Sequence, residues 1–357
     1  MGRERVLKAL NLEEPDRVPL FDFLYEQRSF ENVLGRKIAE VTPEVCVEGH
    51  KALGLDMMCV SPGPRKGWKN RVEGESMVDE WGIEYKLSPD LITLPWYVKG
   101  PISGPESLDG YEMPDPRAAG RLEFVEKVLR IVGEDMAVAA SFPIGGPFTA
   151  ASFLTGFEAF LKYLLAKPRF AQKLLDRVTS YCCEIGSLCV DSGVEIIFLN
   201  EDLGHVDGPF VSPTLFRASL RPHIEKLVRR MKGKGAIVLL HSDGNINLLL
   251  GDILEMGIQG LHPIERKASM DIGHIKRRFG GSMALIGNVD ASSTLQWGTG
   301  EDIARQTLEC IRSAAPGGGY VLASDHSIHP GIPGQNAKLM FETARHNGAY
   351  PYKALPS

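Results

Sequence analysis

The sequence predicts an α/β fold, a single (β/α)8 barrel of the TIM type, on three observations. Eight short apolar runs recur along the chain, and most are apolar at nearly every position, as in a parallel sheet buried on both faces. Amphipathic segments follow the runs, and this alternation is typical of parallel βαβ units. The length of 357 residues suits one such barrel with added segments, so we expect one domain over residues 1–357.

The expected strands are short and rich in aliphatic and β-branched residues. They occupy residues 17–23, 57–61, 136–141, 194–199, 236–240, 258–261, 283–286 and 320–323. Eight strands favour closure into a barrel. An open doubly wound sheet is the alternative, but no Gly-x-Gly-x-x-Gly pattern follows the first strand.

Helices are expected between the strands. Ser212 followed by Pro213 is a typical helix start, and Gly233 and Gly235 end the apolar stripe that follows it. Two further helices are expected over residues 247–256 and 271–278.

One segment, approximately residues 62–130, interrupts this alternation between the second and third strands. Residues 77–85 within it have the pattern of a β-hairpin, and glycines and prolines surround them. We expect an insertion over the barrel mouth, which would act as a lid, as a partner surface, or as a purely structural flap.

The composition excludes several classes of protein. A net charge of −5 argues against a nucleic-acid binder, because such proteins need positive charge to attract phosphate. The charged start, residues 1–5, predicts no signal peptide, and no apolar run has the roughly 20 residues of a membrane span. Six cysteines in a chain of this length do not predict a disulfide scaffold, so we expect a cytoplasmic protein with reduced thiols.

Polar side chains follow the expected strands, at the end where barrels of this type carry their chemistry. Four of the nine histidines lie there, namely His241, His262, His326 and His329. Histidines scattered at random through loops would not concentrate in this way.

A metal site is predicted from four of these residues: His241, Asp243, Glu265 and His326. His241 and Asp243 can reach one ion if the chain bends between and after them, and Gly244 permits the bend. Two imidazoles with carboxylates suit zinc, while manganese and iron remain compatible. Glu201 could replace Asp243 as a ligand, support the ligands or act as a general base. The alternative is a hydrogen-bonded polar network without a metal.

The sequence resembles the uroporphyrinogen decarboxylase superfamily over nearly its whole length. The residues that carry the resemblance are 5–10, 15–19, 146–149, 200–202, 287–290, 325–327 and Pro330. The superfamily fold is a (β/α)8 barrel. The resemblance implies one of two chemistries: decarboxylation of uroporphyrinogen, or methyl transfer to or from corrinoid proteins with zinc at the barrel mouth.

The decarboxylase alternative meets a physical objection. Its substrate carries eight carboxylates, and the superfamily's decarboxylases have an arginine-rich segment after the first strand. Here residues 21–28 offer Asp22, Glu26 and one arginine, which would repel a polyanion. In this alternative, Asp56 or Asp22 would stabilise positive charge on a pyrrole.

The methyltransferase interpretation gains from the metal site. Enzymes of the superfamily that methylate thiols use His-x-Cys and a distant Cys on zinc, where this chain has His241-x-Asp243 and His326. With Glu265 the spacing also resembles the zinc ligands of cobalamin-independent methionine synthase. Nitrogen and oxygen ligands leave zinc a stronger Lewis acid, suited to the oxygen of a methyl ether. The resemblance therefore implies an O-demethylase-like enzyme that passes methyl to Co(I) of a corrinoid protein. A methoxylated aromatic compound is the first candidate for the methyl donor, and methanol, methylamine and other methylated compounds are the alternatives.

Roles for the remaining candidates complete the prediction. Glu201 and Asp202 would orient substrate or carry protons, and Asp22 is a further catalytic candidate. Candidate substrate-binding residues, with core packing as the alternative for the aromatic ones, are Phe21, Phe23, Tyr25, Phe142, Phe148 and Asn288. The corrinoid would reside on a separate partner protein, since no cobalamin-binding domain fits in this chain. The resemblance also allows a homodimer, and a catalytically silent binding subunit is a third alternative.

Overall fold

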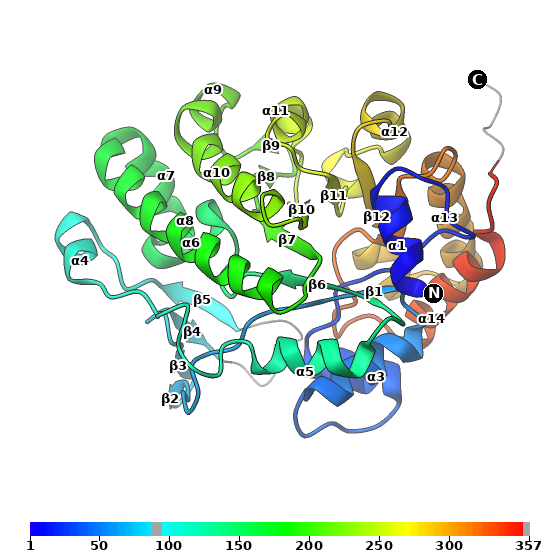
Figure 1. The fold of residues 1–357 in the computed structure, drawn as a ribbon, viewed down its shortest axis with the longest axis horizontal. Coiled ribbons are helices and arrows are strands. Elements are labelled where there is room, and N and C mark those ends of the chain that lie inside the picture. Colours follow the sequence, from blue (N-terminus) through cyan, green and yellow to red (C-terminus); the bar gives the residue numbers. More distant parts are fainter. Residues whose placement is uncertain (88–94, 353–357) are drawn as a thin grey trace.

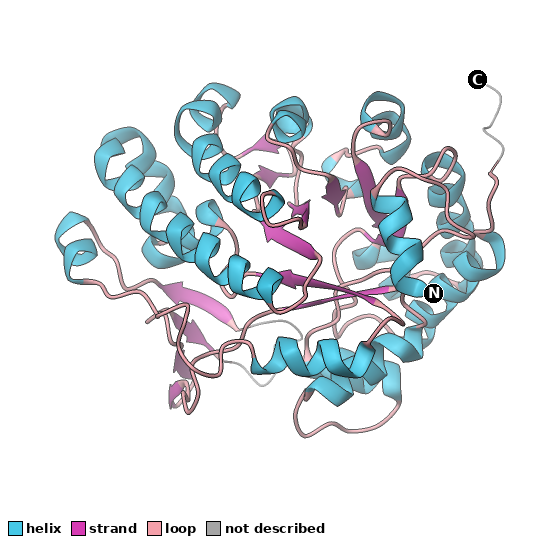
Figure 2. Ribbon diagram, in the orientation of Figure 1, coloured by secondary structure: helices cyan, strands magenta, loops and turns pink. Residues whose placement is uncertain are grey.

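A curved sheet of seven parallel strands forms the centre of the computed structural model, which describes residues 1–87 and 95–352 (Figures 1 and 2). In spatial order the strands are β1 (Met57–Val60), β6 (Ala137–Ser141), β7 (Ile196–Asn200), β10 (Ile237–His241), β11 (Gly260–His262), β12 (Ala284–Val289) and β13 (Tyr320–Ser324). Each of them overlaps an apolar run, so the expected α/β barrel of the TIM type is confirmed.

The eighth position of the barrel is occupied by residues 19–21, which join β13 to β1. The amide of Phe21 donates to Leu322 O at 3.0 Å, and the amide of Asp56 donates to Leu20 O at 2.8 Å. In place of the strand expected over residues 17–23, the structure has two isolated bridges, from Leu20 to Leu322 and from Arg17 to Ala349. The reason is local: Pro19 has no N–H to donate, and the Leu20 N–H donates instead to the Asp56 carboxylate at 2.9 Å.

The barrel interior is filled by alternate residues of the strands, because successive side chains of a strand point to opposite faces. The inward residues are Phe21, Phe23, Met57, Ala137, Ala139, Ile196, Phe198, Leu239, Ala284, Ile286, Val321 and Ala323. Helix α1 (Gly2–Leu10) adds Val6, Ala9 and Leu10 to this inner core and packs on β1, β6 and β13. The alanines leave room for stacked rings such as Phe21 and Phe198, whose centroids are 5.4 Å apart.

Helices cover the outside of the sheet (Figure 2). They are α2 (Gln27–Leu34), α3 (Pro43–Leu53), α5 (Glu123–Val132), α6 (Pro147–Thr155), α7 (Phe157–Ala166), α8 (Pro168–Asp191), α10 (Arg221–Lys232), α11 (Leu250–Glu255), α12 (Ile272–Phe279), α13 (Gly300–Ala314) and α14 (Gly334–Asn347). Short elements in the connections are β8 (Gly204–His205), β9 (Gly208–Pro209), α9 (Pro213–Leu215), η1 (Phe216–Leu220), η2 (Asn247–Leu249), η3 (Arg266–Ala268) and η4 (Ala291–Leu295). In residues 1–87 and 95–352, no helix combines the length and apolar character needed to cross a membrane.

The three expected helices are present. Ser212 Oγ accepts from the amide of Leu215 at 3.2 Å, as a helix N-cap does, and the helix continues through α9 and η1 into α10. Residues 247–256 contain η2 and α11, and residues 271–278 fall on α12.

The segment between β1 and β6 contains more structure than a hairpin. An antiparallel sheet consists of β2 (Arg71–Glu73), β3 (Ser76–Val78), β4 (Glu84–Lys86) and β5 (Trp96–Lys99). Pairing of Met77 with Tyr85 confirms the expected hairpin. The sheet packs on α6, where Tyr97 meets Phe153 with centroids 5.6 Å apart. After α4 (Pro105–Gly110), helix α5 packs on α3, so the helical layer of the barrel resumes before residue 130.

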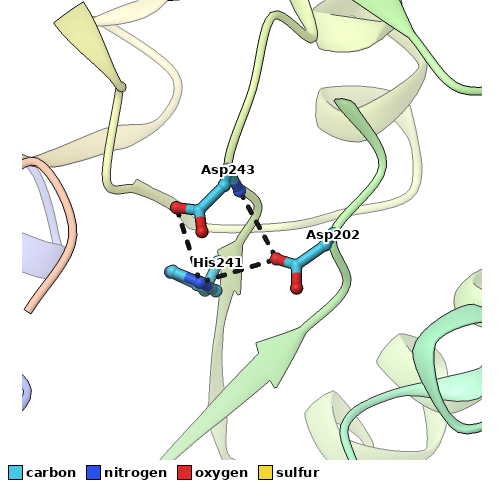
Figure 3. A group of neighbouring side chains, drawn as sticks. All are labelled: Asp202, His241 and Asp243. Carbon is cyan, nitrogen blue, oxygen red and sulfur yellow. Dashed lines mark hydrogen bonds and ion pairs between the residues drawn. The ribbon is translucent and has the colours of Figure 1, made fainter. Parts of the chain in front are cut away.

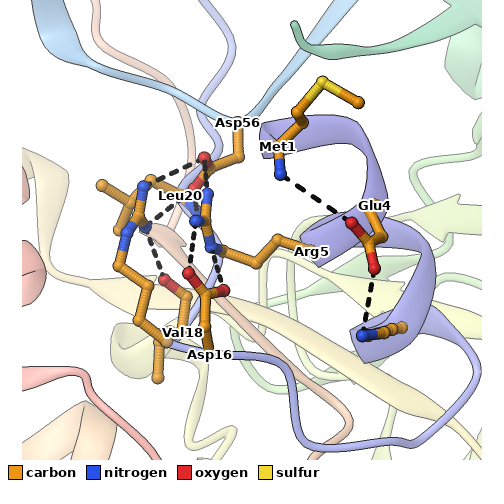
Figure 4. Close-up of polar contacts among 9 residues, drawn as sticks. Met1, Glu4, Arg5, Asp16, Val18, Leu20 and Asp56 are labelled. Carbon is orange, nitrogen blue, oxygen red and sulfur yellow. Dashed lines mark hydrogen bonds and ion pairs between the residues drawn. The ribbon is translucent and has the colours of Figure 1, made fainter. Parts of the chain in front are cut away.

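Two arginines and one aspartate connect the first 20 residues to the start of β1 (Figure 4). Asp56 accepts from Arg5 Nη1 at 2.6 Å and from Arg17 Nη1 at 2.8 Å, and its side chain is 5% exposed. Arg5 also binds Asp16 at 2.6 Å. These contacts tie α1 and residues 16–20 to the start of β1. Because Asp56 precedes β1, it lies at the amino end of the barrel, so the role that the decarboxylase alternative gave to Asp56 is not supported.

We expect Asp56→Ala to lower the free energy of unfolding by about 3–5 kcal/mol, because it leaves two half-buried guanidinium groups without their shared acceptor. Urea denaturation followed by circular dichroism measures this. The matched control is Glu158→Ala, which removes an exposed ion pair to Lys162 and should cost less than about 0.5 kcal/mol. Equal losses in the two variants would contradict a special role for Asp56.

Candidate metal centre

Three potential ligands meet at the carboxyl end of the barrel (Figure 3). Asp202 follows β7, His241 ends β10, and Asp243 comes two residues later. One ligand atom from each residue lies within 4.8 Å of the others. Among residues 1–87 and 95–352, this is the one group of histidine, cysteine or acidic side chains with such spacing.

The spacing within the group leaves room for an ion. His241 Nε2 is 3.6 Å from Asp202 Oδ1 and 3.8 Å from Asp243 Oδ1, and both distances exceed a hydrogen bond. Asp243 Oδ1 is buried and has no hydrogen-bond partner within the described chain. A buried carboxylate oxygen without a partner is costly unless something else binds it. The geometry therefore fits a bound cation.

A tight turn after β10 directs Asp243 toward this group. Gly244 adopts φ +79°, and a Cβ at this position would collide with the main chain of Gly204. The bend that the sequence predicted at Gly244 is thus present. Glu265 holds it, since its Oε2 accepts from the amide of Gly244 at 2.7 Å. Glu265 lies outside the group of three, so its expected role as a ligand gives way to one of supporting the turn.

His326 stands beside the group, with its ring centroid 6.5 Å from that of His241. Its Nε2 is 3.4 Å from Asp243 Oδ2, its Nδ1 is 2.9 Å from Ser327 Oγ, and its side chain is 49% exposed. Burial opposes charge on His326, but the hydrogen bond and charge of Asp243, with Asp202 and Asp325, raise its pKa to about 9. Burial also works to raise the pKa of Asp243, yet His241 and His326 hold it below its usual value. A carboxylate and an imidazolium are therefore favoured here.

Asp202 lies where the sequence expected a substrate-orienting or proton-carrying residue, but it belongs to the potential ligand set. Its Oδ1 also faces the amide of Asp243 at 3.5 Å. Burial raises the pKa of Asp202, and His241 acts in the opposite direction.

His262 is a residue that the predicted ligand set omitted. It pairs with His241 across β10 and β11, and the two Nδ1 atoms are 2.7 Å apart. It is fully buried, and burial holds its pKa well below the usual value. The sequence does contain a signal for this position: His262 directly follows the sixth expected strand, as His241 directly follows the fifth.

Glu201 is not part of the group. It is fully buried, and its two oxygens accept from the amides of Phe148 and Thr149 at 3.0 and 2.9 Å. These amides open α6, so Glu201 binds the positive end of a helix and anchors it. Burial raises its pKa to about 8 against those hydrogen bonds. The expected ligand or base role is not supported by this placement.

Asp22 and Asn288 also have structural partners. Asp22 is fully buried and accepts from Ser324 N at 2.8 Å and from Ser324 Oγ at 2.9 Å, which joins the first segment to β13. Asn288 is buried and donates to Ile264 O at 2.8 Å. Neither contact places these side chains in the group of Figure 3, so the catalytic role expected for Asp22 and the substrate-binding role expected for Asn288 lack support.

The five aromatic candidates divide between three environments. Phe21 and Phe23 belong to the inner core, and the Phe23 ring lies 5.5 Å from that of His241. Tyr25 is 42% exposed and 6.1 Å from Phe23, so it extends this aromatic surface outward. Phe142 and Phe148 belong to the outer core between sheet and helices. This placement does not support the substrate-binding role expected for these last two, because they belong to the core outside the barrel interior.

Comparison with known proteins places this architecture in a family. The family model described as uroporphyrinogen decarboxylase (URO-D) matches residues 1–347. The chain belongs to the uroporphyrinogen decarboxylase family.

Members of this family with two activities are similar to the chain. A methylcobamide:CoM methyltransferase, MtaA, from Methanosarcina barkeri is 27% identical over 241 residues, covering 66% of this chain and 67% of that protein. A uroporphyrinogen decarboxylase from Coxiella burnetii is 22% identical over 276 residues, covering 75% and 73%. The solved structure of a methyltransferase from Methanosarcina mazei superimposes with a TM-score of 0.75 at 23% identity, covering 97% of this chain and 98% of that one. The superposition on the Methanosarcina mazei structure supports the barrel fold of this chain.

The environment of Asp22 predicts a pH dependence of stability. Burial raises its pKa to about 7, although hydrogen bonds from Ser324 oppose the shift. The native state therefore keeps this proton longer than the unfolded chain, and stability present below about pH 4 is lost as the pH rises to 7.

Asp22→Asn can keep both contacts to Ser324 by reversing the hydroxyl, and it cannot titrate. Relative to wild type, the variant should gain about 2 kcal/mol of unfolding free energy between pH 5 and pH 8. Urea denaturation at the two pH values measures the gain. Asp135→Asn, at an exposed carboxylate, serves as the control and should follow wild type. A constant difference between Asp22→Asn and wild type would contradict the shift.

Proposed function

We propose that this protein is a metal-dependent methyltransferase that moves a methyl group from a methyl ether, of the methoxylated aromatic class, to a corrinoid carried by a partner protein. The observation that carries the proposal is the cysteine-free group of Asp202, His241 and Asp243 at the carboxyl end of the barrel. Similarity to a methylcobamide:CoM methyltransferase supports methyl transfer, since the identity exceeds that to the decarboxylase.

The donor set fits zinc. Imidazole nitrogen and carboxylate oxygen are both zinc ligands, and catalytic zinc sites hold three protein ligands with one open position. Asp202, His241 and Asp243 would supply the three. His326, 3.4 Å from Asp243, would stand at the edge of the open position rather than within the set. Manganese and iron also accept these donors.

The chemistry follows from the absence of thiolate donors. Zinc bound here would act as a Lewis acid toward an ether oxygen and would stabilise that oxygen as it departs. In the overall transfer, the methyl carbon leaves oxygen and joins Co(I), which supplies the electron pair of the new bond. The ether oxygen keeps the pair of the broken bond and leaves as an alkoxide or phenolate.

The chain's own residues would bind and orient the donor. Tyr25 presents an exposed aromatic ring, which packs on the buried Phe23 beside His241, and this suits an aromatic donor held with its ether oxygen toward the ligands. His326 Nε2, which lies 3.4 Å from Asp243 Oδ2, would turn its N–H to the departing oxygen once Asp243 binds the metal. Ser327 Oγ, 2.9 Å from His326 Nδ1, would keep the ring in place.

Metal content tests the ligand assignment. We expect about one zinc per chain in the wild type and loss of that zinc in His241→Ala, because one of three donors is removed. His326→Ala should keep its zinc, and His205→Ala, at an exposed histidine 61% accessible to solvent, is the matched control. Elemental analysis after gel filtration measures all four proteins. Full retention of zinc in His241→Ala would rule out the assignment.

Turnover tests the reaction class. Zinc-loaded protein mixed with a methoxybenzoate and a reduced corrinoid should convert Co(I) to methyl-Co(III), which the absorption spectrum reports, and His326→Ala should slow this at least tenfold. Methyl transfer with thiols but not with ethers would contradict the donor class. Release of CO2 from uroporphyrinogen without methyl transfer would favour the decarboxylase alternative instead.

A further inference from the structure

The contact between His241 and His262 connects the metal group to the barrel interior. The two residues are register partners on β10 and β11, and their Nδ1 atoms are 2.7 Å apart. Backbone contacts fix the pair, since the amide of Ser242 donates to His262 O at 3.0 Å. Neither ring can leave this contact without disrupting the pairing of β10 with β11 or the packing of the inner core.

Two nitrogens at this distance share one proton. With no proton between them the lone pairs would repel, and with two the hydrogens would collide. One histidine therefore donates and the other accepts. Each neutral ring carries a single N–H, so the choice made at the Nδ1 pair also decides the state of both Nε2 atoms.

His262 Nε2 lies among apolar rings. It is buried and has no hydrogen-bond partner in the described part of the chain. Three rings surround the imidazole at 74–90° to its plane: Phe21 at 5.8 Å, Phe23 at 5.1 Å and Phe198 at 5.5 Å. An N–H in such a cage gains a weak attraction to the π systems, which an unprotonated nitrogen does not.

His241 Nε2 faces the carboxylates of Asp202 and Asp243. Without an ion, an N–H at this nitrogen is attracted to the Asp202 and Asp243 oxygens 3.6 and 3.8 Å away, although both distances exceed a hydrogen bond. With an ion bound between these groups, the nitrogen must offer its lone pair beside the two carboxylates. In the metal-bound protein, both ends of the pair therefore favour a proton on His241 Nδ1 and a proton on His262 Nε2.

We propose that His262 is a positioning residue, which accepts the Nδ1 proton of His241 and so keeps the Nε2 of His241 free to bind a metal. This inference rests on the proposed function, because it takes His241 to be a ligand of the proposed metal. Metal-binding histidines usually give their second N–H to a carboxylate or a carbonyl. A neutral imidazole sealed among phenylalanines orients the ligand without adding negative charge, which preserves the Lewis acidity that an ether substrate needs.

Nitrogen-15 NMR of the zinc-loaded protein tests the proposal directly. Ring nitrogens with a proton, without a proton and with a bound metal differ in chemical shift, and the His262 signals are assigned as those lost in His262→Leu. We expect His262 to carry its proton on Nε2 and to have an unprotonated Nδ1. A proton on His262 Nδ1, or binding of zinc by His241 through Nδ1, would overturn the proposal.

Cobalt(II) titration, followed by the visible spectrum, gives a second measurement. His262→Leu should weaken Co(II) binding 10- to 100-fold. His262→Asn places an oxygen near the former Nδ1 and should restore affinity to within about threefold of wild type. Phe198→Leu disturbs the cage but leaves the acceptor, so it should lower the melting temperature without changing the tautomer or the affinity. Equal affinity in His262→Leu and wild type would also overturn the proposal.

The two measurements separate this proposal from the proposed function. A wild type that binds neither zinc nor Co(II) would refute the metal centre and with it this role of His262. A wild type that binds Co(II) no more tightly than His262→Leu, or whose zinc-loaded form keeps a proton on His262 Nδ1, would refute the role of His262 and leave the metal centre intact.

Discussion

The register of β10 against its two neighbours is the constraint on which the candidate centre depends. His241 pairs with Asn200 on β7 and with His262 on β11. A slip of one residue would reverse which side chains of β10 face the barrel axis, and His241 would point into the outer helices. A slip would also move Phe198 and Leu239 out of the packed barrel interior, so the inner core maintains this register. The reactive groups are therefore positioned by apolar residues several positions upstream of them.

Much of this arrangement could be predicted from the sequence. The apolar runs locate all seven strands, and the rule that chemistry follows the carboxyl ends leads to His241, Asp243 and His326. Gly244 marks the bend that brings Asp243 back toward His241. These features are local, since each depends on residues close together in the chain and on a periodicity that a single segment displays.

The roles of the other candidate residues depend on neighbours from distant segments of the chain, which the sequence does not identify. Glu201 and Asp202 are adjacent and chemically alike, yet Glu201 binds the start of α6 whereas Asp202 meets His241. Nothing within residues 200–202 distinguishes them, because the difference lies in the amides of residues 148 and 149. Phe142 and Phe148 likewise follow a strand end and still enter the outer core, since the helices that cover them come later in the chain.

The close approach of Gly244 to Gly204 shows that the backbone and the side chains of the candidate centre are constrained differently. The main chain there tolerates no added side chain, because even a Cβ would overlap the opposite backbone. The side chain at residue 243, in contrast, projects from a path that the backbone alone determines. A lineage or a protein engineer could exchange the donor atom at 243 and so change which metal or substrate is favoured, while the loop that presents it stays as it is. Such a division lets one barrel acquire new chemistries by single substitutions.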